Sequence, residues 1–247
     1  MIKLFAAIFM LLDHIGFFLC KGGTPQYAIL RMVGRLSMPM FGYCIARGFY
    51  YSKKKGTLKK YFKNLIIFSI ISQIPFGLIS FTTTKKFTFE NSFNIGFTWL
   101  FSLAILIILS KIKKPYKKEH IFLFLAAVLI FALSFFVKVD YGSYGVIFPI
   151  MFYFFMFEIY SPLLCFVFSL IMYVYYCIID KVEVFSPRNQ IVAIFSVFLI
   201  VLLKQNDDKI KLPKRFFYWF YPIHMGVLIL IKIFIIEGVN SYNLFFK

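Results

Sequence analysis

Long apolar runs alternate with short polar segments along the whole chain. The runs predict nine helices, over residues 3–20, 27–51, 64–81, 93–110, 121–138, 145–159, 161–179, 189–204 and 216–236. A run of about 20 apolar residues is long enough to cross the hydrocarbon core of a bilayer, and Pro39 predicts a kink in the run 27–51. The pattern therefore predicts an all-α, polytopic integral membrane protein with about nine transmembrane helices (about eight to ten by length). We expect a single transmembrane helical domain over residues 1–247.

The composition excludes a soluble fold. Of the 247 residues, 61% are hydrophobic, 22% are aromatic and only 15% are charged. A soluble domain of this size has no interior large enough for so much apolar surface, so several segments must face lipid. The four cysteines are scattered without CxxC spacing, which predicts neither a disulfide framework nor a metal site. The chain also lacks a Walker A phosphate loop, an HExxH motif and a serine–histidine nucleophile motif.

Positive charge is concentrated in three segments between the apolar runs. The net charge is +18, from 28 Lys and Arg residues against 10 Asp and Glu residues. The segments 52–63, 111–120 and 204–215 follow the second, fourth and eighth predicted helices, so all three fall on one side of the membrane. Cytoplasmic loops carry such an excess of Lys and Arg. We therefore expect a cytoplasmic N-terminus, a multi-pass protein of the cell (plasma or inner) membrane, contact with membrane lipid, and no binding of nucleic acid.

Two polar pairs interrupt the first two apolar runs. Asp13 and His14 lie in the first run, and Arg31 and Arg35 lie four residues apart in the second. Ionisable side chains inside a membrane are costly and usually have a partner or a function. We expect Asp13 to pair with Arg31 or Arg35, and His14 to face a cavity as a general base. The alternative is that Asp13 and His14 only hold the two helices together.

More polar side chains are predicted in the same outer half of the bilayer. At about 1.5 Å per residue, His14 lies roughly 10 Å and Arg35 roughly 12 Å below the outer face. The predicted topology brings further side chains to this half: Asn94, Thr98, Asp140, Tyr141 and, near the midplane, His224. The arginines are candidates for binding a phosphate, a carboxylate or a developing oxyanion. Asn94 is a candidate for orienting a substrate or His14, although such residues more commonly form hydrogen bonds between helices.

Six short blocks carry a resemblance to a known family. They lie, in order, at residues 11–16, 30–41, 72–76, 94–98, 139–146 and 218–224. The first contains Asp13-His14-Ile15-Gly16, and the last ends in Tyr221-Pro222-Ile223-His224. Together the blocks resemble the TraX family of polytopic membrane proteins, in the family's order and across nearly the whole chain.

The resemblance implies a reaction. The family's named member is associated with N-terminal acetylation of conjugative pilin, and the family is similar to membrane acyltransferases that use cytoplasmic acyl-CoA to modify acceptors at the outer face. It therefore implies acetyl-CoA as the donor substrate and an amine or hydroxyl of an extracytoplasmic acceptor, either a peptide or protein N-terminus or a cell-envelope glycan. The pilin substrate itself belongs to one branch and is not carried over to this chain.

The predicted roles divide the polar residues into two groups. We expect His14, Asp13 and Arg35 to be catalytic, and a second set to bind substrate: Arg31, Asn94, Thr98, Asp140, Tyr141 and His224. No metal is expected. In one variant, His14 or His224 carries the acyl group. The prediction for the fold is that His14, Arg35, Asn94 and Asp140 converge around one cavity that has a path to the cytoplasm.

Two other functions fit the same residues. In a transporter or flippase, Asp13, His14 and the arginines would bind a substrate or a proton. The chain shows no repeat between its halves, which weakens that interpretation. In a non-catalytic membrane assembly factor, the buried charges would only hold helices together.

Overall fold

The computed structural model describes residues 1–84, 92–112, 117–180, 190–205, 210, 213 and 215–237, and the regular structure in these ranges is helical. The helices are α1 (Ile2–Leu19), α2 (Pro25–Gly34), α3 (Ser37–Lys54), α4 (Leu58–Thr84), α5 (Ile95–Leu109), α6 (Lys118–Phe136), α7 (Gly142–Tyr153), α8 (Pro162–Asp180), α9 (Ile191–Ile194), α10 (Ser196–Lys204) and α11 (Phe216–Leu230). Two π-helical segments, η1 (Phe154–Glu158) and η3 (Ile231–Glu237), continue α7 and α11.

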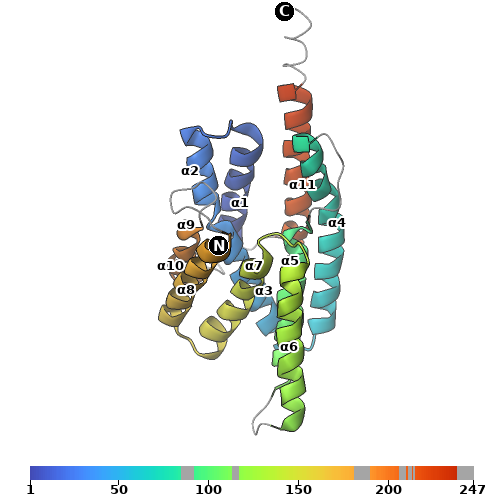
Figure 1. Cartoon of the computed structure of the whole chain (residues 1–247), viewed down its shortest axis with the longest axis vertical. Helices are drawn as coiled ribbons and strands as arrows, with labels where there is room; N and C mark the ends of the chain where they lie inside the picture. Colours follow the sequence, from blue (N-terminus) through green and yellow to red (C-terminus); the bar gives the residue numbers. More distant parts are fainter. Residues whose placement is uncertain are drawn as a thin grey trace, which may run out of the picture.

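The central helices are α3 and α7, and the others surround them (Figure 1). α1 packs against α2, α3 and α11, while α5 packs against α4, α6 and α7. Fully buried aromatic rings fill the contact between α3 and α7, with Phe49 on one helix and Phe148 and Phe152 on the other. The turn between α1 and α2 lies at the upper end of the molecule in Figure 1, and the Lys-rich ends of α3, α4 and α6 lie at its lower end.

The single long helix predicted over 27–51 is wrong, because the structure divides it into α2 and α3. The N–H groups of Arg35 and Leu36 donate to carbonyls only three residues earlier, those of Met32 and Val33, at 3.2 Å each. Pro39 has no N–H with which to bond the carbonyl of Arg35, so the regular helical ladder is interrupted ahead of the proline. The predicted kink therefore falls one turn before Pro39 and places Arg35 at the bend.

The Lys-rich segment predicted between helices at 52–63 is itself mostly helical. α3 continues to Lys54 and α4 begins at Leu58, so a short turn joins them. Parts of the other two Lys-rich segments, 111–120 and 204–215, lie outside the described residues. The helix predicted over 189–204 is divided at Phe195, whose N–H donates to the carbonyl of Val192 at 3.1 Å.

Four helices are long and apolar enough to cross a membrane: Ile2–Leu19, Leu58–Ile79, Lys118–Phe136 and Phe216–Phe234. Shorter apolar helices cover Ile95–Leu109, Gly142–Glu158, Pro162–Ile178 and Ile191–Lys204. Large apolar side chains stay exposed on α6, where Phe122 is 74% and Phe136 is 82% exposed. A contiguous apolar surface of this kind is suited to lipid rather than water. The all-α membrane fold agrees with the sequence prediction, while nine crossings and a cytoplasmic N-terminus stay predictions.

Candidate functional site

An ion pair joins α1 to α2. The Nη1 atom of Arg31 lies 2.5 Å from Oδ2 of Asp13, and Asp13 is 6% exposed. Gly34 permits this close approach, because a Cβ at that position would lie 2.3 Å from the Cβ of Asp13. The sequence left the partner of Asp13 open between the two arginines, and the structure pairs it with Arg31.

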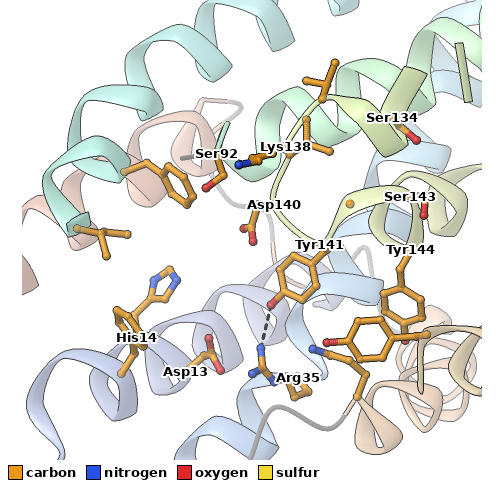
Figure 2. A pocket seen from close by; sticks show the side chains of 18 of the residues that line it. Asp13, His14, Arg35, Ser92, Ser134, Lys138, Asp140, Tyr141, Ser143 and Tyr144 are labelled. Carbon is orange, nitrogen blue, oxygen red and sulfur yellow. Dashed lines mark hydrogen bonds between the residues drawn. The ribbon is translucent and has the colours of Figure 1, made fainter. Parts of the chain in front are cut away.

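Arg35 contacts the connection between α6 and α7 instead. Its Nη1 donates a hydrogen bond of 3.3 Å to the hydroxyl of Tyr141 (Figure 2). Tyr141 precedes α7 with a φ of 59°, a left-handed conformation that is uncommon for a bulky residue and is found where the surroundings over-determine it. This bond links residues far apart in the sequence and turns the phenol ring of Tyr141 toward α2.

The start of α5 holds that connection in place. Phe93 and the segment Lys138–Asp140 exchange two backbone hydrogen bonds, of 2.7 and 2.8 Å. Thr98 donates from Oγ1 to the carbonyl of Asp140 at 2.6 Å. Thr98 therefore fixes the backbone that carries Asp140 and Tyr141. Its own side chain is fully buried and is not among the residues that line the cavity described below.

Asn94 is engaged in a separate network. Its Nδ2 donates to the carbonyl of Ser69 and to Oε1 of Gln73, both at 2.7 Å, and its Oδ1 accepts from the N–H of Gly96 at 2.8 Å. The side chain thus caps α5 and ties it to α4. Asn94 is fully buried and does not line the cavity, so the predicted convergence does not extend to it. Gln73, to which the sequence analysis gave no role, is its main partner.

His14 and His224 form a direct hydrogen bond between α1 and α11. The distance from Nδ1 of His14 to Nε2 of His224 is 2.6 Å. The second ring nitrogen of His224, Nδ1, lies 2.7 Å from the carbonyl oxygen of Phe220, one turn earlier on α11. The sequence placed His224 near the midplane as a substrate-binding residue. The structure places it beside His14, 7% exposed and outside the set of cavity-lining residues.

A cavity of about 790 Å³ lies beside these side chains. It is bordered by α1, α2, α4, the end of α6, the start of α7 and the end of α8. Six of the nine candidate residues line it: Asp13, His14, Arg31, Arg35, Asp140 and Tyr141. In Figure 2, Asp140 and Tyr141 approach from one side of the cavity, and Asp13, His14 and Arg35 approach from the other. The structure thus brings His14, Arg35 and Asp140 together, while the catalytic and binding roles of all nine residues stay predictions.

Several buried polar atoms on the cavity-lining residues have no hydrogen-bond partner within the described part of the chain. They include Oδ1 of Asp13, Nε of Arg31, the hydroxyl of Tyr144 and Oε1 of Gln190. Leaving such atoms unpaired costs about 1–3 kcal/mol each, so the cavity is suited to a ligand or waters with both donors and acceptors. Tyr144 and Gln190 were not predicted from the sequence. Tyr144 could have been found from its place in the block 139–146. The only feature that distinguishes Gln190 in the sequence is a polar side chain at the start of an apolar run.

Asp140 lies in the connection between α6 and α7, outside the helices. Burial raises the pKa of its carboxyl to about 7, against the attraction of Arg35, which favours the ionised form. A carboxyl with a pKa of about 7 changes charge near neutral pH. It therefore gives the cavity a pH-dependent net charge.

A second, smaller cavity of about 110 Å³ approaches His14 from the opposite direction. Lys3, Gly48 and Tyr61 line it toward the Lys-rich end, and Met10 and Tyr221 line it toward the histidines. The ring centroid of Tyr221 lies 6.2 Å from that of His14. The two cavities thus approach the histidine pair from opposite ends of the helices.

The helices and the larger cavity define a helical membrane protein with a polar, charged cavity between its spans. The family model described as "TraX protein" matches residues 1–232, and the chain belongs to the TraX family.

Two curated relatives are similar over part of their lengths. One is the probable fimbrial assembly protein FimC, serogroup H1, of Dichelobacter nodosus, 33% identical over 158 residues, which are 61% of this chain and 59% of that protein. The other is the uncharacterized protein RP591 of Rickettsia prowazekii (strain Madrid E), 35% identical over 74 residues, which are 30% of this chain and 25% of that protein. The chain thus spans about three fifths of the first relative and a quarter of the second. No solved structure matches the chain.

Proposed function

We propose that this protein is a membrane-embedded acyltransferase that moves an acetyl group from acetyl-CoA to an amine or hydroxyl of an extracytoplasmic acceptor. The observation that carries the proposal is the placement of His14. Its imidazole borders the large cavity within the same cluster as Arg35 and Asp140, at the end of the helices away from the Lys-rich segments. An imidazole held beside a polar cavity is suited to accept a proton from a bound nucleophile.

The proposed orientation places the Lys-rich ends in the cytoplasm of a cell (plasma or inner) membrane. Their Lys and Arg side chains are suited to hold the phosphates of CoA. The small cavity between Lys3 and Tyr221 supports a path for the thioester arm toward His14. The acceptor would enter the large cavity from the other side, where its polar groups would meet the side chains of Asp13, Tyr144 and Gln190.

The proposed step balances without a further reactant. The acceptor N–H or O–H gives its proton to His14 while the nitrogen or oxygen bonds to the acetyl carbon. The Arg35 guanidinium stabilises the negative charge on the acetyl oxygen. The carbon–sulfur bond then breaks, and the proton held by His14 passes to the sulfur, so that CoA leaves as a thiol. Asn94, whose amide is fully engaged, is not assigned a part in this step.

The test measures transfer from radiolabelled acetyl-CoA by the purified full-length protein in lipid nanodiscs. The acceptors are short peptides with a free N-terminus and cell-envelope glycans. We expect His14→Ala to lose transfer by about 10²–10⁴-fold, the usual contribution of a general base. His120→Ala is the matched control, because His120 lies in the first turn of α6 at the Lys-rich end, outside the cavity lining, and it should keep wild-type transfer. A folded wild-type protein that transfers no acetyl group to either acceptor class would refute the proposal.

A second candidate function is a non-catalytic assembly factor, favoured by the printed name of the Dichelobacter relative. In that case the Asp13–Arg31 pair and the histidine pair would serve only to hold α1, α2 and α11 together. Cells lacking the protein would then assemble fewer surface fimbriae or pili, and a His14→Gln variant that folds normally would restore them fully. An acetyltransferase whose product is needed for assembly would not be restored by that variant.

A further inference from the structure

The hydrogen bonds of the histidine pair determine where its protons lie. The carbonyl of Phe220 can only accept, so Nδ1 of His224, 2.7 Å away, must carry a proton. A neutral imidazole carries one proton, so Nε2 of His224 is then an acceptor. The bond of 2.6 Å to His14 must therefore be donated by Nδ1 of His14. The remaining nitrogen, Nε2 of His14, is left with a lone pair and no proton.

The ring geometry supports a true imidazole–imidazole hydrogen bond. The two ring planes are inclined by only 12°, and their centroids lie 4.9 Å apart. This separation is close to the bond length plus the two ring radii, so the rings lie edge to edge in nearly one plane. A lone pair of imidazole lies in the ring plane, so the bond has a favourable direction. Contacts of His224 with the ring of Phe220, at 4.8 Å, and with that of Tyr221, at 5.8 Å, help to hold it there.

We infer that His224 is a positioning residue that fixes the tautomer of His14, so that Nε2 of His14 is presented as an unprotonated base beside the cavity. The use of that base in acetyl transfer rests on the proposed function. A histidine side chain in water favours the other tautomer, with the proton on Nε2, so a hydrogen-bond partner is needed to hold this one. The group that orients the base is a second imidazole, because the neighbouring carboxylate of Asp13 is engaged by Arg31.

The pair also gives a route for the proton. When Nε2 of His14 takes a proton from an acceptor, Nδ1 of His14 can pass its own proton along the existing bond to Nε2 of His224. The positive charge is then shared by two rings, with Nδ1 of His224 still donating to the Phe220 carbonyl. This is useful near Arg31 and Arg35, whose positive charges oppose a cation localised on His14. Return of the proton along the same bond restores the starting state.

The first test reads the tautomers directly and needs no acetyl-CoA. The chain has three histidines, so ¹⁵N-histidine labelling of the full-length protein in nanodiscs gives a simple NMR spectrum. At mildly alkaline pH, where exposed imidazole is neutral, His14 and His224 should both show a protonated Nδ1 and an unprotonated Nε2. A coupling across the hydrogen bond should connect Nδ1 of His14 to Nε2 of His224. A protonated Nε2 on either residue, or no coupling between the two rings, would overturn the inference.

His120 is an internal control in the same spectrum. Its Nδ1 accepts from the N–H of Lys117 at 3.0 Å, so the same argument predicts the opposite tautomer, with the proton on Nε2. The single-residue variants His14→Gln and His120→Gln assign the signals. If His120 shows a protonated Nε2, the tautomer that water also favours, while the other two show a protonated Nδ1, the spectrum resolves both tautomers in one sample.

The second test uses two variants of His224. In His224→Gln the amide oxygen can still accept from Nδ1 of His14, so the tautomer of His14 should persist. In His224→Phe the acceptor is lost, and the proton should move to Nε2 of His14. Under the proposed function, His224→Gln should keep at least tenfold more transfer than His224→Phe. If the predicted tautomers are found but no variant or wild-type protein transfers acetyl groups, the proposed function fails and the positioning of His14 stands. Equal tautomers of His14 in both variants would overturn the inference.

Discussion

Two clusters of buried polar side chains lie among the apolar helices, and they differ in how completely they are bonded. The capping cluster (Ser69, Gln73 and Asn94) joins α4 to α5, and the cavity cluster (Asp13, His14, Arg31 and Arg35) joins α1, α2 and α11. Each amide nitrogen and oxygen of Asn94 and Gln73 has a partner, through bonds of 2.7–3.2 Å. In the cavity cluster, Oδ1 of Asp13 and Nε of Arg31 have none within the described residues.

The difference separates a structural network from a candidate binding site. A fully satisfied buried network makes the fold rigid and has no capacity left for a ligand. A partly satisfied one is costly unless something else supplies the missing partners. Of the two clusters, only the cavity cluster borders a space of about 790 Å³ that is large enough for a ligand. The polar side chains of the two clusters thus have different predicted uses, and variants in each cluster test the distinction.

The largest expected effect is a loss of stability when the close packing of α1 against α2 at Gly34 is disturbed. In Gly34→Ala the new Cβ would lie 2.3 Å from the Cβ and 2.7 Å from the Cα of Asp13, so α1 and α2 must separate. Weakening a buried ion pair and overpacking its surroundings should cost about 3 kcal/mol or more of the free energy of unfolding. Chemical denaturation of the protein in detergent measures the change. Gly226→Ala is the control, since a Cβ at that position would have no atom within 4 Å apart from its chain neighbours and the backbone of its own helix. Equal stabilities of the two variants would contradict the packing of Gly34 against Asp13.

The next effect separates activity from stability within the cavity cluster. In Arg35→Gln the Asp13–Arg31 pair remains, so the unfolding free energy should change less than in Gly34→Ala. Under the proposed function the transfer rate should fall roughly a hundredfold or more, as for the loss of one oxyanion donor. Acetyl transfer and denaturation are measured on the same preparation. Lys21→Gln removes a positive charge in the turn between α1 and α2, outside the cavity lining, and should change neither quantity. A variant that loses stability but transfers normally would assign Arg35 to the fold alone.

The capping cluster should respond in the opposite way. Asn94→Ala removes the cap of α5 and the two bonds that Nδ2 donates to the Ser69 carbonyl and to Oε1 of Gln73, which should cost about 2 kcal/mol of stability. Oε1 of Gln73 keeps only the backbone N–H of residue 94, at 3.0 Å. The transfer rate per folded molecule should stay close to wild type. Ser110→Ala, at the other end of α5, is the control for a lost side-chain bond near a helix end. A loss of transfer in Asn94→Ala at unchanged stability would move Asn94 into the site and remove the distinction between the clusters.

The sequence predicted the helices more fully than the contacts between them. The apolar runs alone indicated α1, α4, α6 and α11, because length and hydropathy are local properties. The break at Arg35 was missed, since the residues around it stay apolar and only the missing N–H of Pro39 marks it. The depths expected from the helical rise placed His14 and His224 in one half of the bilayer. It did not reveal that they bond to each other, because that contact joins residues 210 apart and depends on how α11 packs on α1.

The last expected effect concerns the charge of the cavity near neutral pH. Since the pKa of Asp140 is raised from 3.8 to about 7 in the folded protein, the folded chain holds a proton in that range that the unfolded chain releases. The free energy of unfolding therefore falls as the pH rises from 3.8 to about 7. Asp140→Asn cannot titrate, so its unfolding temperature should fall less than that of wild type across this range. The charged neighbours Asp13, Arg31 and Arg35 are present in both proteins, so the difference between the two profiles isolates Asp140.

Ser143→Ala controls for a change in the same segment of the cavity wall and should keep the wild-type profile. Parallel profiles of wild type and Asp140→Asn would show that Asp140 is ionised at all these pH values. The Asp140 carboxylate would then be a permanent negative charge beside Arg35. The two negative charges of Asp13 and Asp140 would balance the two positive charges of Arg31 and Arg35. A flatter profile in Asp140→Asn would instead support a cavity whose net positive charge increases as the pH falls below about 7, the value of the Asp140 pKa.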